Sequence, residues 1–170
     1  MIQLLRITGL LFAGWLVSSC SISYKFNQSS IDYTKVSSIT IHDFPNLAQL
    51  VYAPLAQQFT EALKDKYTRQ TKLQLKNDGG DLDLEGEITG YNLTPLAVTD
   101  NMYASQTRLT IVVRVRFTNK SDSEQDFERT FQAHSEFDNT NTIDQVQDEL
   151  CDVIMKEIID LIFNETVATW

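Results

Sequence analysis

Apolar and polar residues alternate along two short stretches in the first half of the chain. Between about residues 36 and 44, Ile39 and Ile41 alternate with polar residues, which is the pattern of a strand with one buried face. A shorter alternation at 73–75 precedes the Asn-Asp-Gly-Gly sequence of 77–80, a combination typical of a turn. These stretches predict one early strand and one short second strand.

Three longer alternating stretches follow, at about 82–91, 107–117 and 126–135. The first has an apolar face and places Tyr91 on the opposite face; its apolar positions are Leu82, Leu84, Gly86, Ile88 and Gly90. The second predicts a strand whose apolar face carries Leu109, Ile111, Val113, Val115 and Phe117. The third has Phe127, Phe131 and Ala133 on one face, and Arg129 falls among them without an evident role.

Two segments have the three-to-four-residue spacing of amphipathic helices. The first begins near Pro54, because proline is tolerated in the first turn of a helix, and its apolar stripe is Leu55, Phe59, Ala62, Leu63 and Tyr67. The second follows Thr142, which forms a capping-box pattern with Gln145. Its predicted stripe is Ile143, Val146, Leu150, Ile154, Ile158, Leu161 and Ile162.

Each predicted helix and the predicted sheet has one apolar face that must be covered. The simplest solution is an α+β two-layer sandwich in which two helices pack on one face of a four- to five-stranded, mostly antiparallel mixed sheet. The predicted order of elements is β-α-β-β-β-β-α.

The first twenty residues have the pattern of a secretion signal that ends at a lipid-attachment cysteine. Arg6 precedes an apolar run at 9–17, which is too short to cross a bilayer, and Ser18-Ser19-Cys20 follows. We therefore expect residues 1–19 to be a signal peptide, residues 20–34 to be a lipid anchor at Cys20 and a tether, and residues 35–170 to form a single domain. The alternatives are a retained membrane helix and a secreted protein with Cys20 near its new N-terminus.

The net charge and the cysteine content limit the binding partners and the disulfide bonds that we expect. The 170-residue chain has a formal net charge of -9, which argues against nucleic acid, because affinity for phosphate comes from basic side chains. Acylation would account for Cys20, so Cys151 would have no disulfide partner. The position of Cys151 between apolar residues of the second helix predicts a buried thiol.

Little in the sequence points to catalysis. His42 and His134 are the two histidines, and neither belongs to a nucleophile motif. The cysteines, histidines and carboxylates have no metal-ligand spacing. We expect no enzymatic activity, no catalytic residue, no metal and no cofactor.

One row of arginines stands out in this acidic chain. Arg108, Arg114 and Arg116 lie on the polar face of the 107–117 strand, and Asp83, Glu85 and Glu87 lie on the polar face of the preceding strand. Cross-strand ion pairs are the preferred interpretation. The alternative is a site for a phosphate or carboxylate group, such as a glycolipid head group, because the planar guanidinium suits such ligands.

The connection at 93–104 is unusually apolar for a link between strands. Its candidate partner-binding residues are Leu96, Val98, Met102 and Tyr103. Either these residues contact a partner, or the loop folds back over the core.

Residues Val17-Ser18-Ser19-Cys20 resemble a lipobox. Taken in order and together with this lipobox, several stretches of the chain resemble the LptE family of lipopolysaccharide-assembly lipoproteins, in the form found in Bacteroides-like bacteria. These stretches are 36–41, 54–63, 84–88, 129–131, 137–138 and 147–150. The resemblance implies a lipid-anchored outer-membrane protein that faces the periplasm and sits as a plug in the lumen of an LptD-like β-barrel. It also implies a 1:1 complex that aids barrel folding and lipopolysaccharide delivery.

Two functions remain open from the sequence. The first is this barrel subunit; the second is an independent periplasmic lipoprotein that binds a lipid or glycan through the arginine row. The sequence leaves direct contact with lipopolysaccharide open, because the connection at 94–106 contains Asp100 and no lysine or arginine.

Overall fold

The computed structural model describes residues 33–50, 52–96 and 105–167 of the chain. Its elements, in chain order, are β1 (Ser38–Ile41), α2 (Leu55–Gln70), β2 (Gln74–Lys76), β3 (Leu82–Pro95), β4 (Gln106–Asn119), a 3-10 turn (Ser123–Gln125), β5 (Phe127–Asp138) and α3 (Ile143–Thr166). The strands form one five-stranded sheet in the order β2-β1-β3-β4-β5. The predicted α+β fold and order of elements are therefore confirmed.

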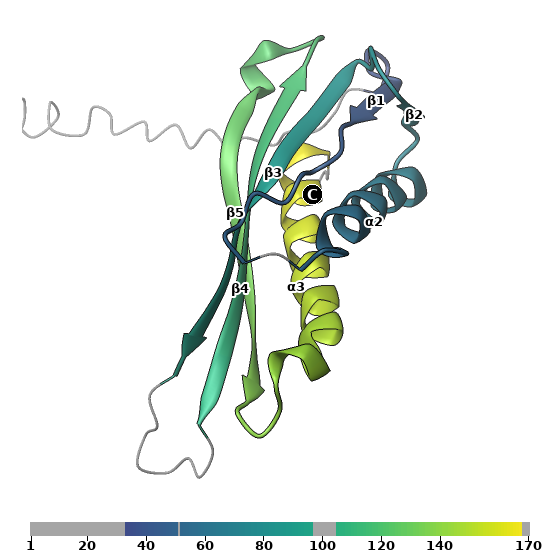
Figure 1. The fold of residues 1–170 in the computed structure, drawn as a ribbon. Helices are drawn as coiled ribbons and strands as arrows, with labels where there is room; N and C mark the ends of the chain where they lie inside the picture. Colours follow the sequence, from purple (N-terminus) through teal and green to yellow (C-terminus); the bar gives the residue numbers. More distant parts are fainter. Residues whose placement is uncertain (1–32, 51, 97–104, 168–170) are drawn as a thin grey trace, which may run out of the picture.

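The sheet is mixed because β1 runs parallel to both β2 and β3, whereas β3, β4 and β5 are antiparallel neighbours. These three long strands form a ribbon that extends well beyond the short strands β1 and β2 (Figure 1). Both helices lie on the same side of the sheet, so the other side is uncovered by any described element (Figure 1). This arrangement is the two-layer sandwich that the apolar faces predict.

The helices are fixed to each other and to the sheet by a continuous core. Tyr67 of α2 lies at its centre: the ring packs edge-on against Phe163 of α3, with ring centroids 5.2 Å apart. The Tyr67 hydroxyl shares a buried hydrogen bond with the hydroxyl of Thr166. The predicted cap is also confirmed, since Thr142 and Gln145 form a capping box at the start of α3. Among the described residues, no helix has the length and apolar content needed to cross a membrane.

Strand β1 is buried on both faces, which its alternating sequence did not predict. Ser38 and Thr40 are as buried as Ile39, because the residues that precede β3 cover the second face of β1: Gly80 N–H donates to the Thr40 hydroxyl, and the Ser38 hydroxyl donates to Asp81. The carboxylate of Asp81 accepts hydrogen bonds from the backbone N–H and hydroxyl groups of Ser37 and Ser38, at 2.9–3.0 Å. The backbone bond from Ser37 and the hydroxyl bond from Ser38 are the main reasons why the pKa of Asp81 falls to about 2.

A β-bulge changes the faces of β3 after Ile88. The pairing with β4 skips one residue there, so that Gly90 lies opposite Val112 and Tyr91 lies opposite Ile111. Ile111 is fully buried, and Tyr91 is buried beside it. The predicted outward position of Tyr91 and inward position of Gly90 are therefore wrong, because one extra residue reverses every later side chain.

Two residues of the predicted apolar helix stripes are exposed, and Arg129, which the sequence left without a role, has partners in the structure. Arg129 does lie on the inner face of β5, opposite Val115, where it pairs with Glu165 of α3 and contacts the ring of Phe127. Ala62 is exposed, and the Leu161 side chain is 41% exposed. The buried stripe of α3 is wider than predicted, because this helix packs against α2 as well as the sheet. To the predicted Leu150, Ile154, Ile158 and Ile162 it adds Cys151, Met155, Ile159 and Phe163.

Cys151 is fully buried, as the sequence predicts. Burial is the main reason why the pKa of its thiol rises to about 11, since the thiolate would lose its hydration. Burial and the neighbouring Cys151 thiol raise the pKa of the Tyr91 hydroxyl.

Candidate functional site

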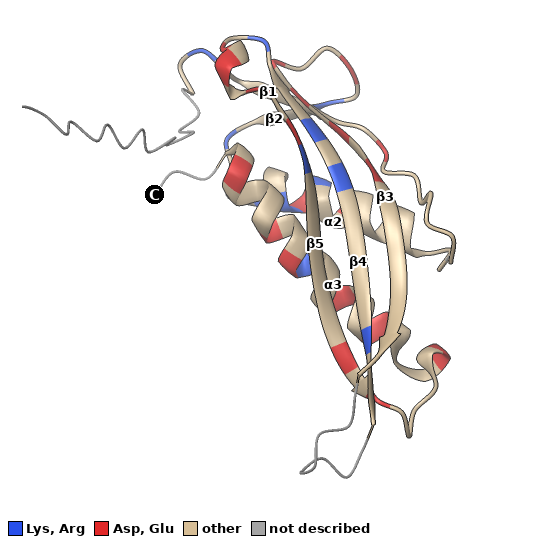
Figure 2. Ribbon diagram, turned by 90° about the vertical axis from the view of Figure 1, so that its left-hand side faces the viewer, with Lys and Arg blue, Asp and Glu red and all other residues tan. Residues whose placement is uncertain are grey.

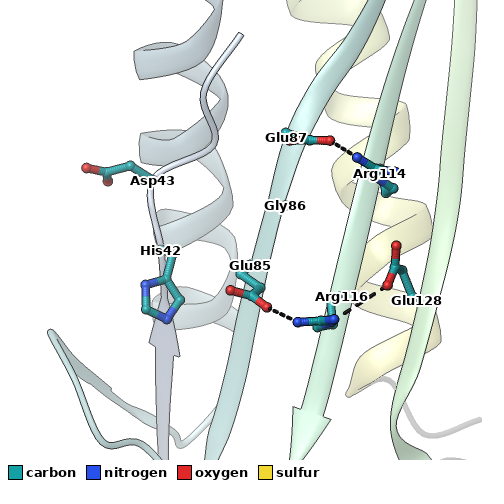
Figure 3. A pocket seen from close by; sticks show the side chains of 8 residues that line it. All are labelled: His42, Asp43, Glu85, Gly86, Glu87, Arg114, Arg116 and Glu128. Atoms are coloured by element: carbon teal, nitrogen blue, oxygen red, sulfur yellow. Dashed lines mark hydrogen bonds and ion pairs between the residues drawn. The ribbon is translucent and has the colours of Figure 1, made fainter. Parts of the chain in front are cut away.

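Charged side chains gather at the two ends of the uncovered sheet face. Figure 2 shows two basic positions near one end of β4 and a third near the other end. The first end contains a shallow hollow of about 430 Å³. Its lining residues come from β3, β4, β5 and the segment that follows β1: His42, Asp43, Glu85, Gly86, Glu87, Arg114, Arg116 and Glu128 (Figure 3).

The register of β3 against β4 pairs the charges in this hollow. Glu85 lies opposite Arg116, and Glu87 lies opposite Arg114. Arg116 Nη1 lies 3.0 Å from Glu85 Oε1, and Arg116 Nε lies 3.7 Å from Glu128 of β5 (Figure 3). Arg114 pairs with Glu87 (Figure 3), and this bond raises the pKa of the guanidinium. The predicted cross-strand ion pairs are therefore confirmed.

The hollow also depends on a close packing contact beneath it. A Cβ atom on Gly86 would lie 2.5 Å from the ring of Phe44 and 2.3 Å from the backbone oxygen of Arg114. Any side chain at this position would push Phe44 out of the core or separate the two strands. Gly86 therefore allows β3 and β4 to align Glu85 and Glu87 with their arginines.

The arginine row is divided into two groups. Arg108 lies six positions before Arg114 on β4, which corresponds to ~20 Å along an extended strand. It pairs with Glu136 of β5, with Arg108 Nη2 2.6 Å from Glu136 Oε1. The three arginines therefore do not converge on one ligand.

A band that contains no lysine, arginine or carboxylate separates these groups on the same face. Across the three long strands, Gly90, Val112 and Gln132 form one row. The next row is Asn92, Thr110 and His134. Such a surface offers hydrogen-bonding groups on a flat sheet, but very little apolar area to bury.

The described residues of this face do not form a catalytic arrangement of the kinds that the sequence was searched for. His42 Nε2 lies 3.1 Å from Asp83 Oδ1, but in the described part of the chain no hydroxyl or thiol hydrogen-bonds to His42 or His134. Within the described ranges, no group of three or more His, Cys, Asp or Glu side chains could hold a metal ion. A nucleophile with its base is therefore not assembled here.

Sequence reasoning missed two carboxylates that complete the face, Glu128 and Glu136, and did not place His42 beside Asp83. Their positions on alternating strands were visible in the sequence, but the register of β1 and β5 was not. Conversely, Leu96 is half-buried and its N–H donates to Gln106 O at 2.8 Å, so it continues the β3–β4 ladder. Cys20, Val98, Met102 and Tyr103 lie outside the described residues.

Fold and site together define a class of protein: a small α+β domain that presents an open, ion-paired sheet face and no assembled catalytic group in its described part. The chain belongs to the LptE family, described as lipopolysaccharide-assembly, which matches residues 36–166. This match assigns the chain to a family of lipopolysaccharide-assembly proteins. Among curated proteins, none matches the sequence.

Solved structures with a similar fold have little sequence identity to this chain. A putative neuraminyllactose-binding hemagglutinin homolog from Helicobacter pylori is 8% identical, with a TM-score of 0.52 over 85% of this chain and 89% of that chain. A minor lipoprotein from Acinetobacter baumannii is 17% identical, with a TM-score of 0.48 over 75% and 89%. The rare lipoprotein B from Shewanella oneidensis is 8% identical, with a TM-score of 0.46 over 75% and 90%. The Helicobacter likeness supports the fold alone.

Proposed function

We propose that this chain is the lipid-anchored subunit that sits in the lumen of an LptD-like outer-membrane β-barrel, in a 1:1 complex. In this role it assists assembly of the barrel and transport of lipopolysaccharide, as the form of the family in Bacteroides-like bacteria would. It faces the periplasm and is held at the outer membrane through Cys20. The observation that carries the proposal is the LptE family match over residues 36–166.

The uncovered sheet face has the properties that a polar barrel wall requires. Each of its arginines has a carboxylate partner, Glu85, Glu87 or Glu136, so that burying the face against a partner leaves no arginine unpaired. The band between these pairs includes Asn92, Thr110, Gln132 and His134, whose side chains can hydrogen-bond to polar groups of a partner. The inner wall of a large outer-membrane barrel is polar, so the two surfaces match in chemistry.

The proposed anchor follows from the N-terminal sequence. Cleavage before Cys20 would free its amine, and acylation of the sulfur and the amine would add the two or more chains that stable membrane attachment needs. Ser21 follows the cysteine, and the absence of an acidic residue at this position favours an outer-membrane destination.

The alternative, an independent lipoprotein that binds a lipid or glycan through Arg108, Arg114 and Arg116, is less well supported. Each of these arginines has a carboxylate partner. An anionic head group would have to displace that carboxylate, and Arg108 is too far from the other two to share the ligand.

The test is affinity purification of the tagged chain from detergent-extracted membranes of its own cells. The proposal predicts a stoichiometric outer-membrane barrel protein in the eluate, identified by mass spectrometry. A Cys20→Ser variant should be absent from the membrane fraction, and its purification should recover less of the barrel protein. Recovery of a lone monomer under mild detergent would contradict the proposal.

A pair of matched variants tests which face meets the barrel. Val112→Arg places a bulky charge at the centre of the uncovered sheet face, next to Gly90. Glu157→Arg introduces the same residue on the exposed surface of α3. We expect barrel recovery to fall at least tenfold for Val112→Arg and to be unchanged for Glu157→Arg. The reverse result would assign the contact to the helical layer.

A further inference from the structure

The charges of the hollow are not balanced, and one row of residues across the sheet has an excess carboxylate. Glu85 of β3, Arg116 of β4 and Glu128 of β5 occupy neighbouring positions in this row. All three line the hollow of about 430 Å³ (Figure 3). Two carboxylates therefore share one guanidinium.

The other two rows that contain an arginine have no such excess. In the adjacent row Glu87 lies opposite Arg114, and towards the other end of β4 Arg108 lies opposite Glu136. The third position of each of these rows is a threonine. The surplus negative charge of the arginine row is therefore the carboxylate of Glu128.

The distances show how Arg116 is divided between its two partners. Arg116 Nη1 lies 3.0 Å from Glu85 Oε1, whereas Arg116 Nε lies 3.7 Å from Glu128 Oε2. An N–H···O hydrogen bond measures ~2.7–3.2 Å, so Arg116 is hydrogen-bonded to Glu85 and is only near Glu128. The Glu128 side chain is 52% exposed. In the free chain, water therefore solvates much of the charge of Glu128.

The proposed function removes this water, because it places the sheet face against the barrel wall. A carboxylate that leaves water is costly unless it gains a partner of opposite charge. Arg116 does not compensate both glutamates, since its closer bond is to Glu85. A positive group on the partner surface is the chemistry that compensates Glu128.

We propose that a lysine or arginine side chain of the barrel partner enters the hollow and pairs with Glu128. This inference rests on the proposed function and names the chemistry that the barrel wall presents at this point. The incoming group displaces neither arginine of the hollow, because Arg114 and Arg116 keep Glu87 and Glu85 as their partners.

Two other occupants fit the hollow less well. A second copy that presented the same face would bring its own Glu128, so the contact would double the surplus. An anionic head group would meet the Glu128 carboxylate and would compete with Glu85 for Arg116. Like charges brought together in a poorly hydrated contact weaken that contact.

A neutral substitution of the same size tests the sign of the interaction. Glu128→Gln would leave a positive group of the barrel without its partner, so we expect the barrel protein recovered per tagged chain to fall at least threefold. Glu128→Lys should reduce this recovery at least tenfold. Glu157→Gln and Glu157→Lys, on the exposed surface of α3, are the matched controls and should leave recovery unchanged.

A second variant leaves Glu128 in place. Thr130→Lys adds an ammonium group two residues further along β5 on the same exposed face, where it can pair with Glu128. We expect this internal cation to occupy the carboxylate and to lower barrel recovery severalfold. If the partner supplies no cation, both Glu128→Gln and Thr130→Lys should raise recovery or leave it unchanged. That result would overturn the proposal.

The remaining outcomes separate this inference from the proposed function. If the unaltered chain recovers no barrel protein, the proposed function itself fails. If Val112→Arg reduces recovery and Glu128→Gln does not, the sheet face meets the barrel and only the basic partner group is ruled out. Stronger binding of Glu128→Gln to vesicles that contain an anionic phospholipid, with unchanged barrel recovery, would overturn the proposal in favour of a lipid site.

Discussion

Arg116 of β4 and Glu85 of β3 lie directly opposite each other on the uncovered sheet face, with Arg116 Nη1 3.0 Å from Glu85 Oε1. Both side chains are about half exposed to solvent. The pair therefore fixes the local register and neutralises charge, but water and salt weaken its contribution to stability.

We expect a small, salt-sensitive coupling between these two residues. In a double-mutant cycle with Arg116→Ala and Glu85→Ala, urea unfolding should give an interaction free energy of about 0.2–1 kcal/mol that decreases in 0.5 M salt. Arg116→Ala should also remove the ion pair with Glu128, the second partner of Arg116. A coupling well above this range would mean that the hollow is much better shielded from water than its exposure suggests.

Protonation of Asp81 should weaken the fold in acid. Its folded-state pKa of about 2 lies below the ordinary value of 3.8, so the stabilisation is complete above pH ~4 and is lost as the pH falls from about 4 to about 2. Asp81→Asn should lower stability at pH 7 and flatten this acid dependence, measured by denaturant unfolding across pH 2–6.

Ser37→Ala provides the graded control for Asp81. It removes one hydroxyl donor and keeps the backbone N–H that has the largest effect on the carboxylate. Its unfolding curve should therefore lie between those of the unaltered protein and Asp81→Asn. If the stability of Asp81→Asn still falls in acid as much as that of the unaltered protein, other carboxylates cause the acid dependence.

The two glycines of β3 should tolerate alanine to different degrees. At Gly86 the added Cβ would meet backbone and the buried ring of Phe44 at 2.3–2.5 Å, whereas at Gly90 it would meet side-chain atoms of Asn92 and Val112 at 3.0–3.1 Å. We expect Gly86→Ala to cost about 2–3 kcal/mol of unfolding free energy and Gly90→Ala under about 1. Equal costs would show that β3 shifts easily against β4.

The hydroxyl contact between α2 and α3 should contribute measurably to stability. Tyr67→Phe removes the buried hydrogen bond to Thr166, which keeps its own bond to the backbone oxygen of Ile162 at 2.9 Å. The expected loss is about 0.5–1.5 kcal/mol in thermal or urea unfolding. Tyr33→Phe, at an exposed tyrosine, is the matched control and should be neutral.

Cys151 should be unreactive in the folded protein. Full burial and a pKa of about 11 leave only ~0.1% of the thiol ionised at pH 8, and the thiolate is the reactive form. Iodoacetamide labelling of this site, followed by mass spectrometry, should proceed at least a hundredfold faster in 8 M urea. Rapid labelling under native conditions would indicate that α3 opens from the sheet.

Strong periodicity made the central elements of this fold predictable. The alternation of Leu109 to Phe117 predicted the inner face of β4 correctly, and Thr142 with Gln145 predicted the start of α3. These signals are local, since each depends on a few neighbouring residues whose side chains repeat every two positions or every three to four. Ion pairing between the carboxylates of β3 and the arginines of β4 was also predictable, because both groups lie on the polar faces of neighbouring antiparallel strands. The register that pairs Glu85 with Arg116 and Glu87 with Arg114 came from the structure.

The sequence by itself therefore determined the fold class, the two buried helix faces and the ion pairs of the β3–β4 hairpin. Only the tertiary structure decided that Tyr91 turns inward after the bulge, that Arg129 reaches Glu165 on α3, and that Arg108 pairs with Glu136 of β5. The physical reason is that these features depend on contacts between segments far apart in the chain. A local pattern predicts which face an element buries, but it does not predict which neighbour will cover that face.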